Sequence, residues 1–158
     1  MLTITGVYEC KADTKGRVAL AAPLRKQLDS VAEAGFILKR SVFQPCLELY
    51  PMQAWNDVMG KVHQLNRFVK RNNDFIRLFS AGVKTIELDS NGRFLIPKDL
   101  MVFAELQNDL VLASAVDIIE IWDKVKYEKS LLTTESEFGD LAEAVMGNLK
   151  YGGDQNVS

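Results

Sequence analysis

The stretch Asp13-Thr14-Lys15-Gly16-Arg17-Val18-Ala19-Leu20 decides the fold, because it returns 76 positions later as Asp89-Ser90-Asn91-Gly92-Arg93-Phe94-Leu95-Ile96. Both copies contain an acid, a small hydroxyl residue, a polar residue, Gly and Arg, followed by an apolar run. A second pair of matches follows in the same order, Leu47-Glu48-Leu49-Tyr50-Pro51 and Ile119-Glu120-Ile121-Trp122-Asp123. Two matches in one order predict that the chain is a duplication of one small unit.

Each copy is predicted to contain four short strands and one short helix. Residues before each turn alternate between apolar and polar side chains, as in half-buried strands, and the turn glycine supplies the positive φ that a tight hairpin needs. Pro23 and Pro97 then precede short helical segments at 24–28 and 98–103. The predicted strands, first copy before second, are 3–10 and 85–88, 17–20 and 93–96, 35–40 and 109–113, and 47–50 and 119–122.

Both copies end in longer stretches with apolar residues at helical spacing. The first runs from Met52 to about Phe79 and is expected to form two helices broken near 71–74; the second runs from Lys124 to Leu149 with a break near 133–135. Apolar stripes of this kind belong to a core or a subunit interface more often than to a cofactor site. The predicted organisation is a first repeat with its helical arm at 1–82, a second at 83–149 and a flexible tail at 150–158.

Composition and charge place the chain among soluble globular proteins. It is 47% hydrophobic and 25% charged, which disfavours disorder. No apolar run approaches the roughly 18 residues of a membrane span, and no signal peptide is recognisable, so a cytoplasmic location is expected. Residues 1–76 contain 11 Lys and Arg against 7 Asp and Glu, whereas residues 77–158 contain 8 against 14. The first half is expected to carry a basic working face, although a solvated surface without a partner can show the same asymmetry.

The paired DTKGR and DSNGR turns, the LELYP and IEIWD motifs and the trailing helical arms resemble the MraZ family of bacterial transcription regulators, over residues 1 to about 149. The resemblance implies an α+β fold of two tandem AbrB-like swapped-hairpin units, which form a small barrel-like pseudo-dimer within one chain. It also implies regulation of the division and cell-wall gene cluster and binding to repeated boxes in double-stranded promoter DNA. A ring-shaped homo-oligomer and a nucleoid-associated location complete the expectation.

The two turns are expected to differ in function. Asp13, Gly16, Asp89, Gly92 and Arg93 are expected to build and fix the turns, and an internal Asp–Arg ion pair is sufficient to explain the arginine of an isolated copy. More cations surround the first turn than the second, so DNA contact is assigned to the first copy and a structural or assembly role to the second. The expected DNA-binding residues are Lys11, Lys15, Arg17, Arg25 and Lys39; a solvated strand end explains Lys39 equally well.

Catalysis is not expected, nor are a cofactor, a metal, a small-molecule substrate or a membrane partner. His63, the only histidine, has no nucleophile or carboxylate at triad-like spacing, and each turn aspartate lies beside an arginine that keeps it ionised. Cys10 and Cys46 have neither a zinc spacing nor a disulfide framework. The alternative to a DNA-binding regulator is an AbrB-like protein-interaction or assembly module without direct DNA binding. Salt-dependent binding to promoter DNA distinguishes these two functions.

Overall fold

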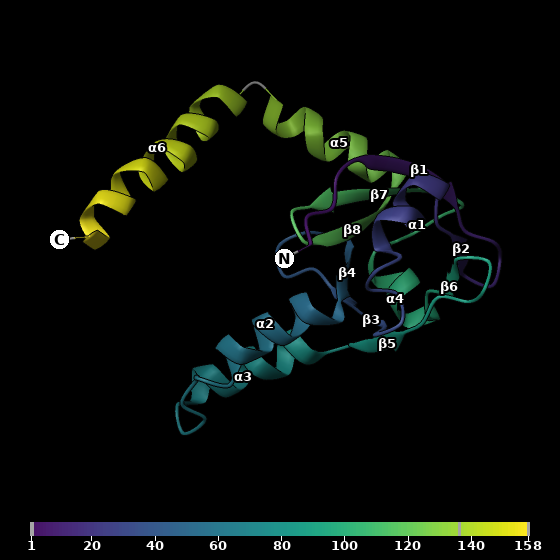
Figure 1. The fold of residues 1–158 in the computed structure, drawn as a ribbon, viewed down its shortest axis with the longest axis horizontal. Helices are drawn as coiled ribbons and strands as arrows, with labels where there is room; N and C mark the ends of the chain where they lie inside the picture. The colour runs from purple at the N-terminus through teal and green to yellow at the C-terminus, as the bar shows by residue number, and fades with distance from the viewer. Residues whose placement is uncertain (1, 136, 158) are drawn as a thin grey trace. The chain divides into compact units, whose positions relative to one another are not determined.

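The computed structural model describes residues 2–135 and 137–157, and it describes side chains for all of these except 133–135 and 150–157. The chain divides into two compact units, residues 1–124, which contain strands β1 to β8, and residues 125–158, whose described part is mostly helical (Figure 1). Neighbouring strands are antiparallel throughout the described sheets. The mixed α+β class predicted from the sequence is confirmed.

The order of elements is the same in both repeats. The first repeat contains β1 (Val7–Lys11), β2 (Arg17–Ala19), α1 (Ala22–Leu28), β3 (Phe36–Arg40) and β4 (Leu47–Pro51). The second contains β5 (Lys84–Ile86), β6 (Arg93–Leu95), α4 (Lys98–Phe103), β7 (Asp109–Ala115) and β8 (Ile118–Asp123). The strand expected at 3–10 begins only at Val7, because Gly6 has a φ of 112° and interrupts the extended backbone.

Strands of the two repeats are interleaved in one six-stranded sheet with the order β1-β7-β8-β4-β3-β5. The first strand of each repeat pairs with the third strand of the other, β1 with β7 and β5 with β3, while the two fourth strands pair with each other. The second strands, β2 and β6, form a separate two-stranded ribbon. Since the outer strands of both repeats have their partners in the opposite repeat, the two repeats build one sheet together.

One apolar core connects the ribbon to the sheet. Leu38, Leu49 and Leu112 are fully buried in it, and the inward-facing Val18 of β2 and Phe94 of β6 pack in the same cluster. Burying a leucine or phenylalanine side chain contributes about 1.5–3 kcal/mol. The core therefore fixes the position of the ribbon, whose opposite face is exposed.

The arm of the first repeat consists of α2 (Met52–Val62) and α3 (Lys70–Ser80). Helix α2 packs Ala54 against the outer face of β3 and β4, and the Trp55 ring of α2 stacks on Phe79 of α3 with 5.8 Å between centroids. The break lies at 63–69, so the break predicted near 71–74 is wrong. The polar side chains at that position belong to α3, and Asn72 and Asn73 donate hydrogen bonds to loop carbonyl groups of residues 66 and 67.

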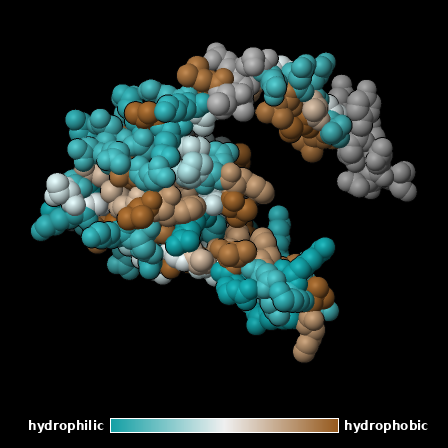
Figure 2. Space-filling model, turned by 180° about the vertical axis from the view of Figure 1, so that it is seen from behind, coloured by the Kyte–Doolittle hydropathy of each residue, from teal (hydrophilic) through white to brown (hydrophobic). Residues whose placement is uncertain are grey.

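The second arm consists of α5 (Lys124–Glu135) and α6 (Phe138–Val157). Phe138, Leu141, Val145 and Leu149 are exposed and lie three to four residues apart, so they share one side of α6. Apolar side chains gather along this helix in Figure 2. The flexible tail expected at 150–158 falls on residues whose side chains lie outside the described part of the chain.

Candidate nucleic-acid interface

Each Asp-X-X-Gly-Arg turn is closed by its own aspartate. Asp13 Oδ1 accepts hydrogen bonds from the backbone amides of Lys15 and Arg17, both at 2.9 Å, and Oδ2 accepts one from Arg17 Nε at 2.8 Å. Asp89 repeats the arrangement, with the Nε of Arg93 at 3.0 Å. Side chains of Arg17 and Arg93 remain 51% and 47% exposed, respectively. The ion pair therefore orients each arginine and leaves a large part of it accessible to an external ligand.

Hydrogen bonding lowers the pKa of both aspartates. For Asp13 the largest cause is the backbone amide of Arg17, and for Asp89 it is the backbone amide of Arg93; the arginine side chains lower both values further. A lowered pKa means that the ionised carboxylate favours the folded turn. This stabilisation is present above the ordinary value of 3.8 and is lost as the pH falls through the lower folded value.

The stability difference between the wild-type protein and the Asp13→Asn, Asp89→Asn double variant is therefore expected to depend on pH. The variant should melt at a lower temperature at neutral pH, and the difference should shrink as the pH falls below the ordinary aspartate pKa of 3.8 and through the lower pKa of the folded protein. Thermal denaturation followed by circular dichroism at a series of pH values measures this. A difference that stays constant down to about pH 2 would show that ionisation of these aspartates does not hold the turns.

The ribbon joins the two turns into one surface. The Ile96 amide donates to the Gly16 carbonyl at 2.8 Å, and the Leu20 amide donates to the Gly92 carbonyl at 3.0 Å. In the ribbon, Arg17 lies opposite Leu95 and Arg93 lies opposite Ala19. Both arginines are on the exposed face, since Val18 and Phe94 between them point into the core. Arg17 and Arg93 are thus diagonal neighbours, about 7–8 Å apart.

Two further cations of the expected set are exposed near the first turn. Lys15 lies in the turn itself. Lys11 ends β1, where its Nζ is 3.8 Å from Asp109 Oδ1 while the side chain remains 84% exposed. An exposed pair at this distance is weak and leaves the lysine available to a phosphate group.

Lys39 does not belong to this surface, which corrects the expectation that it contacts DNA. Its side chain is 1% exposed, and Nζ lies 3.8 Å from Glu48 Oε1 and 4.3 Å from the centre of the Phe79 ring. Nζ also donates to the carbonyl oxygen of Arg40. Burial lowers the pKa of Lys39, and the nearby Glu48 carboxylate partly opposes this shift. Lys39 holds α3 against the sheet and is out of reach of a phosphate backbone.

Arg25 lies at the second turn, although it is close to the first turn in sequence. Its Nη2 donates to the Ser90 carbonyl at 2.7 Å, and its side chain packs over Gly92. The second turn therefore has two arginines of its own, which the linear charge pattern did not indicate. Only the pairing of β2 with β6 brings Arg25 there, so no signal within the first repeat could have predicted it.

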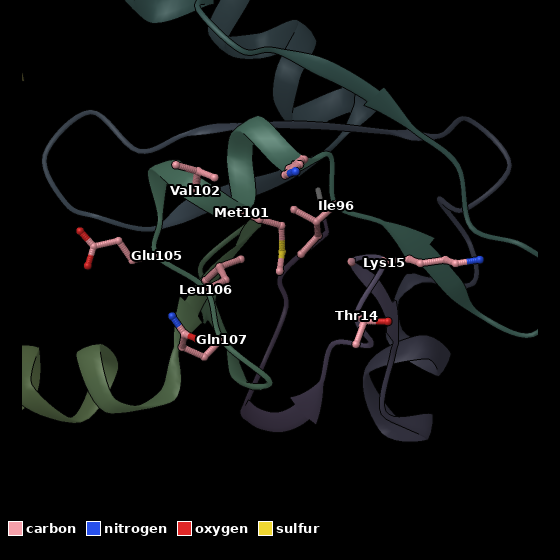
Figure 3. A pocket seen from close by; sticks show the side chains of 10 residues that line it. Thr14, Lys15, Ile96, Met101, Val102, Glu105, Leu106 and Gln107 are labelled. Carbon is pink, nitrogen blue, oxygen red and sulfur yellow. The ribbon is translucent and has the colours of Figure 1, made fainter.

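The first turn borders a hollow of about 650 Å³ instead. Thr14, Lys15 and Gly16 line one side of it, and α4 with the following residues lines the other. Met101 extends from α4 toward this hollow, between Ile96 and Leu106 (Figure 3). The surroundings of the two turns therefore differ, although their internal hydrogen bonds are the same.

Comparison with known proteins detects the same two repeats. The family model described as "MraZ protein, putative antitoxin-like" matches residues 3–78 and again residues 79–148. The chain belongs to the MraZ family. A MraZ relative from Flavobacterium psychrophilum, named transcriptional regulator MraZ, is 61% identical over 149 residues, which cover 94% of this chain and 95% of the relative. A relative of the same name from Christiangramia forsetii is 56% identical over 153 residues, covering 97% and 99%.

More distant MraZ proteins also match almost end to end. The transcriptional regulator MraZ of Pediococcus pentosaceus is 37% identical over 138 residues, covering 87% of this chain and 93% of the relative. Transcription regulation is the role that the names of these relatives state. In the part of the chain that the structure describes, no helix has the length and apolar character that crossing a membrane requires.

Proposed function

We propose that this MraZ protein binds double-stranded promoter DNA through the exposed face of the β2/β6 ribbon and its two turns. The observation that carries the proposal is the pair of aspartate-oriented arginines, Arg17 and Arg93, on the exposed face of a two-stranded ribbon. A ribbon of this width enters the major groove, where arginine donates two hydrogen bonds to guanine O6 and N7. Lys11 and Lys15 add phosphate contacts beside the first turn. Both turns take part in this arrangement, rather than the first alone.

The family resemblance supports the choice of target. We propose the promoter of the division and cell-wall gene cluster, with repeated boxes, each bound by one ribbon. A bound regulator of this kind is nucleoid-associated in the cytoplasm.

Salt dependence of binding tests the proposal. A mobility-shift assay with the fragment upstream of the protein's own gene is expected to show binding that weakens steeply as the salt concentration rises. In a plot of the logarithm of the binding constant against the logarithm of the salt concentration, each neutralised phosphate contributes about −0.9 to the slope. A scrambled duplex of equal length serves as the control and should bind more weakly. Absence of binding to either duplex at low salt would contradict the proposal.

We further propose that the interleaved repeats are two AbrB-like swapped-hairpin units fused into a barrel-like pseudo-dimer. The reciprocal pairing of β1 with β7 and of β5 with β3 supports this interpretation. A fragment of residues 1–82 lacks the partners of β1 and β2, so it is expected to be unfolded at low concentration or to dimerise. Circular dichroism with light scattering checks this; a folded monomer of 1–82 would contradict it.

Self-assembly into a ring is proposed on two grounds. Exposed apolar side chains on α3 and α6, such as Leu78 and Val145, are suited to contacts between copies. A few cations on one ribbon bind DNA weakly. In an assembly, binding of one ribbon holds the others close to the DNA at a high effective concentration, so the whole assembly binds more tightly than one ribbon does. Size-exclusion chromatography with light scattering should show an oligomer at micromolar concentration, and a monomer would contradict this step.

The same exposed helices favour the second candidate, a protein-interaction or assembly module. Helix α6 combines an apolar side with Asp140 and Glu143, a composition suited to a protein partner. This candidate predicts a protein that assembles normally and does not bind promoter DNA at low salt.

A further inference from the structure

Arg25 makes a contact between the two repeats that its place in the sequence does not suggest. It leaves α1 of the first repeat, and its Nη2 donates to the Ser90 carbonyl of the second turn at 2.7 Å. A Cβ atom built on Gly92 would lie 2.7 Å from Arg25 Cδ and 2.8 Å from Nε. The arginine side chain therefore packs directly against the glycine, and the turn can only approach it this closely because Gly92 has no side chain.

The equivalent contact at the first turn is absent from the sequence. The duplication relates Arg25 to the residue 76 positions later, which is Met101. Met101 lines the hollow next to Thr14 and Gly16, but a thioether has no hydrogen to donate to a turn carbonyl. Both turns are held by their own aspartates, but only the second is also held from outside by the guanidinium group of Arg25, whereas the first faces an open hollow.

We propose that Arg25 is a positioning residue that gives the second turn its capacity to discriminate between DNA sequences. This inference rests on the DNA-binding function proposed above. Arg25 fixes the Ser90 carbonyl, and the same turn contains the amides that bind Asp89, which in turn orients Arg93 through Nε. A two-pronged contact to guanine needs a guanidinium held in one orientation. The first turn borders a hollow and lacks this outside contact, so Arg17 is expected to discriminate less between sequences than Arg93 does.

The competing role for Arg25 is a direct phosphate contact. Lys26 provides a matched control for that role, because it is the next residue of α1, is exposed and has the same charge. Its replacement by methionine removes one cation from the same short helix. A phosphate contact strengthens binding to every sequence equally, whereas a positioning contact affects the preferred sequence most.

The experiment compares Arg25→Met, which installs the residue of the second repeat, with Lys26→Met in the full-length protein. Dissociation constants are measured for the promoter fragment and for a scrambled duplex of the same length. Arg25→Met is expected to reduce the ratio of the two constants roughly tenfold, the effect of losing one well-placed base contact. Lys26→Met is expected to leave the ratio unchanged. Arg25 is exposed, so both variants should keep the wild-type melting temperature within a few degrees.

Hydrogen exchange in the free protein gives a second readout that does not depend on DNA. Amides of residues 90–93 are expected to exchange faster in Arg25→Met than in the wild-type protein and in Lys26→Met. Equal ratios and equal exchange in the two variants would overturn the proposal. If the wild-type protein itself does not discriminate between the duplexes, the DNA-binding function fails and this inference fails with it, an outcome that is distinct from equal behaviour of the two variants.

Discussion

Replacing Arg17 and Arg93 together by alanine is expected to lower the affinity for promoter DNA by roughly 10²- to 10⁴-fold, because each two-pronged arginine contact contributes about 1–3 kcal/mol of discrimination. The arginines are diagonal neighbours on the ribbon, so removing both takes away the centre of the proposed interface. Each is about half exposed and packs in no core, so the fold should survive. Fluorescence anisotropy with a labelled promoter fragment measures the loss.

The single variants and one distant variant complete this experiment. Arg17→Ala and Arg93→Ala are each expected to weaken DNA binding, since both turns lie on the same face. Each single variant should account for more than one tenth of the binding free energy that the double variant loses. Arg71→Ala, which removes an exposed arginine from α3, should bind as the wild-type protein does. If the double variant binds as tightly as Arg71→Ala, the ribbon is not the contact surface.

Replacing Gly16 by alanine is expected to destabilise the protein by roughly 2–4 kcal/mol, the sum of left-handed backbone strain and a lost hydrogen bond. Gly16 has a φ of 89°, and a Cβ there would lie 2.6 Å from the Ile96 carbonyl oxygen. The backbone amide of the same residue, Ile96, donates a hydrogen bond to the Gly16 carbonyl. The clash can be relieved only by moving the two turns apart. Urea denaturation of the full chain measures the change.

Two other glycine variants serve as controls for the change in stability. Gly92→Ala has similar strain, at a φ of 74°, but its Cβ would meet the movable side chain of Arg25, so a smaller loss is expected. Gly60 lies inside α2 with nothing within 4 Å of a built Cβ, and Gly60→Ala should stabilise the helix by about 0.5–1 kcal/mol. An unfolding free energy of Gly16→Ala equal to that of the wild-type protein would show that the turns are not tied together at this point.

The short-range features of the fold could be predicted from the sequence because local chemistry determines them. The hydrogen bonds that Asp13 and Gly16 form within the first turn are to groups at most four residues away in the sequence. The alternation of apolar and polar residues around the turn likewise predicts the strands that flank it. The duplication then made the second copy predictable from the first. The Asp–Arg ion pair expected in each turn is present in both.

Features that depend on packing between distant segments could not be predicted in the same way. Lys39 lies next to the end of the apolar strand β3 and resembles part of a solvated strand end, but Phe79 of α3 lies over its ammonium group. Arg25 belongs to the second turn only because the repeats interleave. In both cases the partner comes from a segment 40 or more positions away in the chain, and charge counted along the sequence assigns such residues to the wrong surface.

The most direct measurement of the central claim is a hydrogen-exchange footprint of the full-length protein with and without promoter DNA. The ribbon and its turns are held by exposed hydrogen bonds, so their amides should be accessible to exchange in the free protein. We predict that DNA slows exchange in residues 13–19 and 89–95 together, and that a scrambled duplex does so much less. Slower exchange confined to α2 and α3, with no change in either turn, would contradict the claim that this ribbon is the DNA-binding surface.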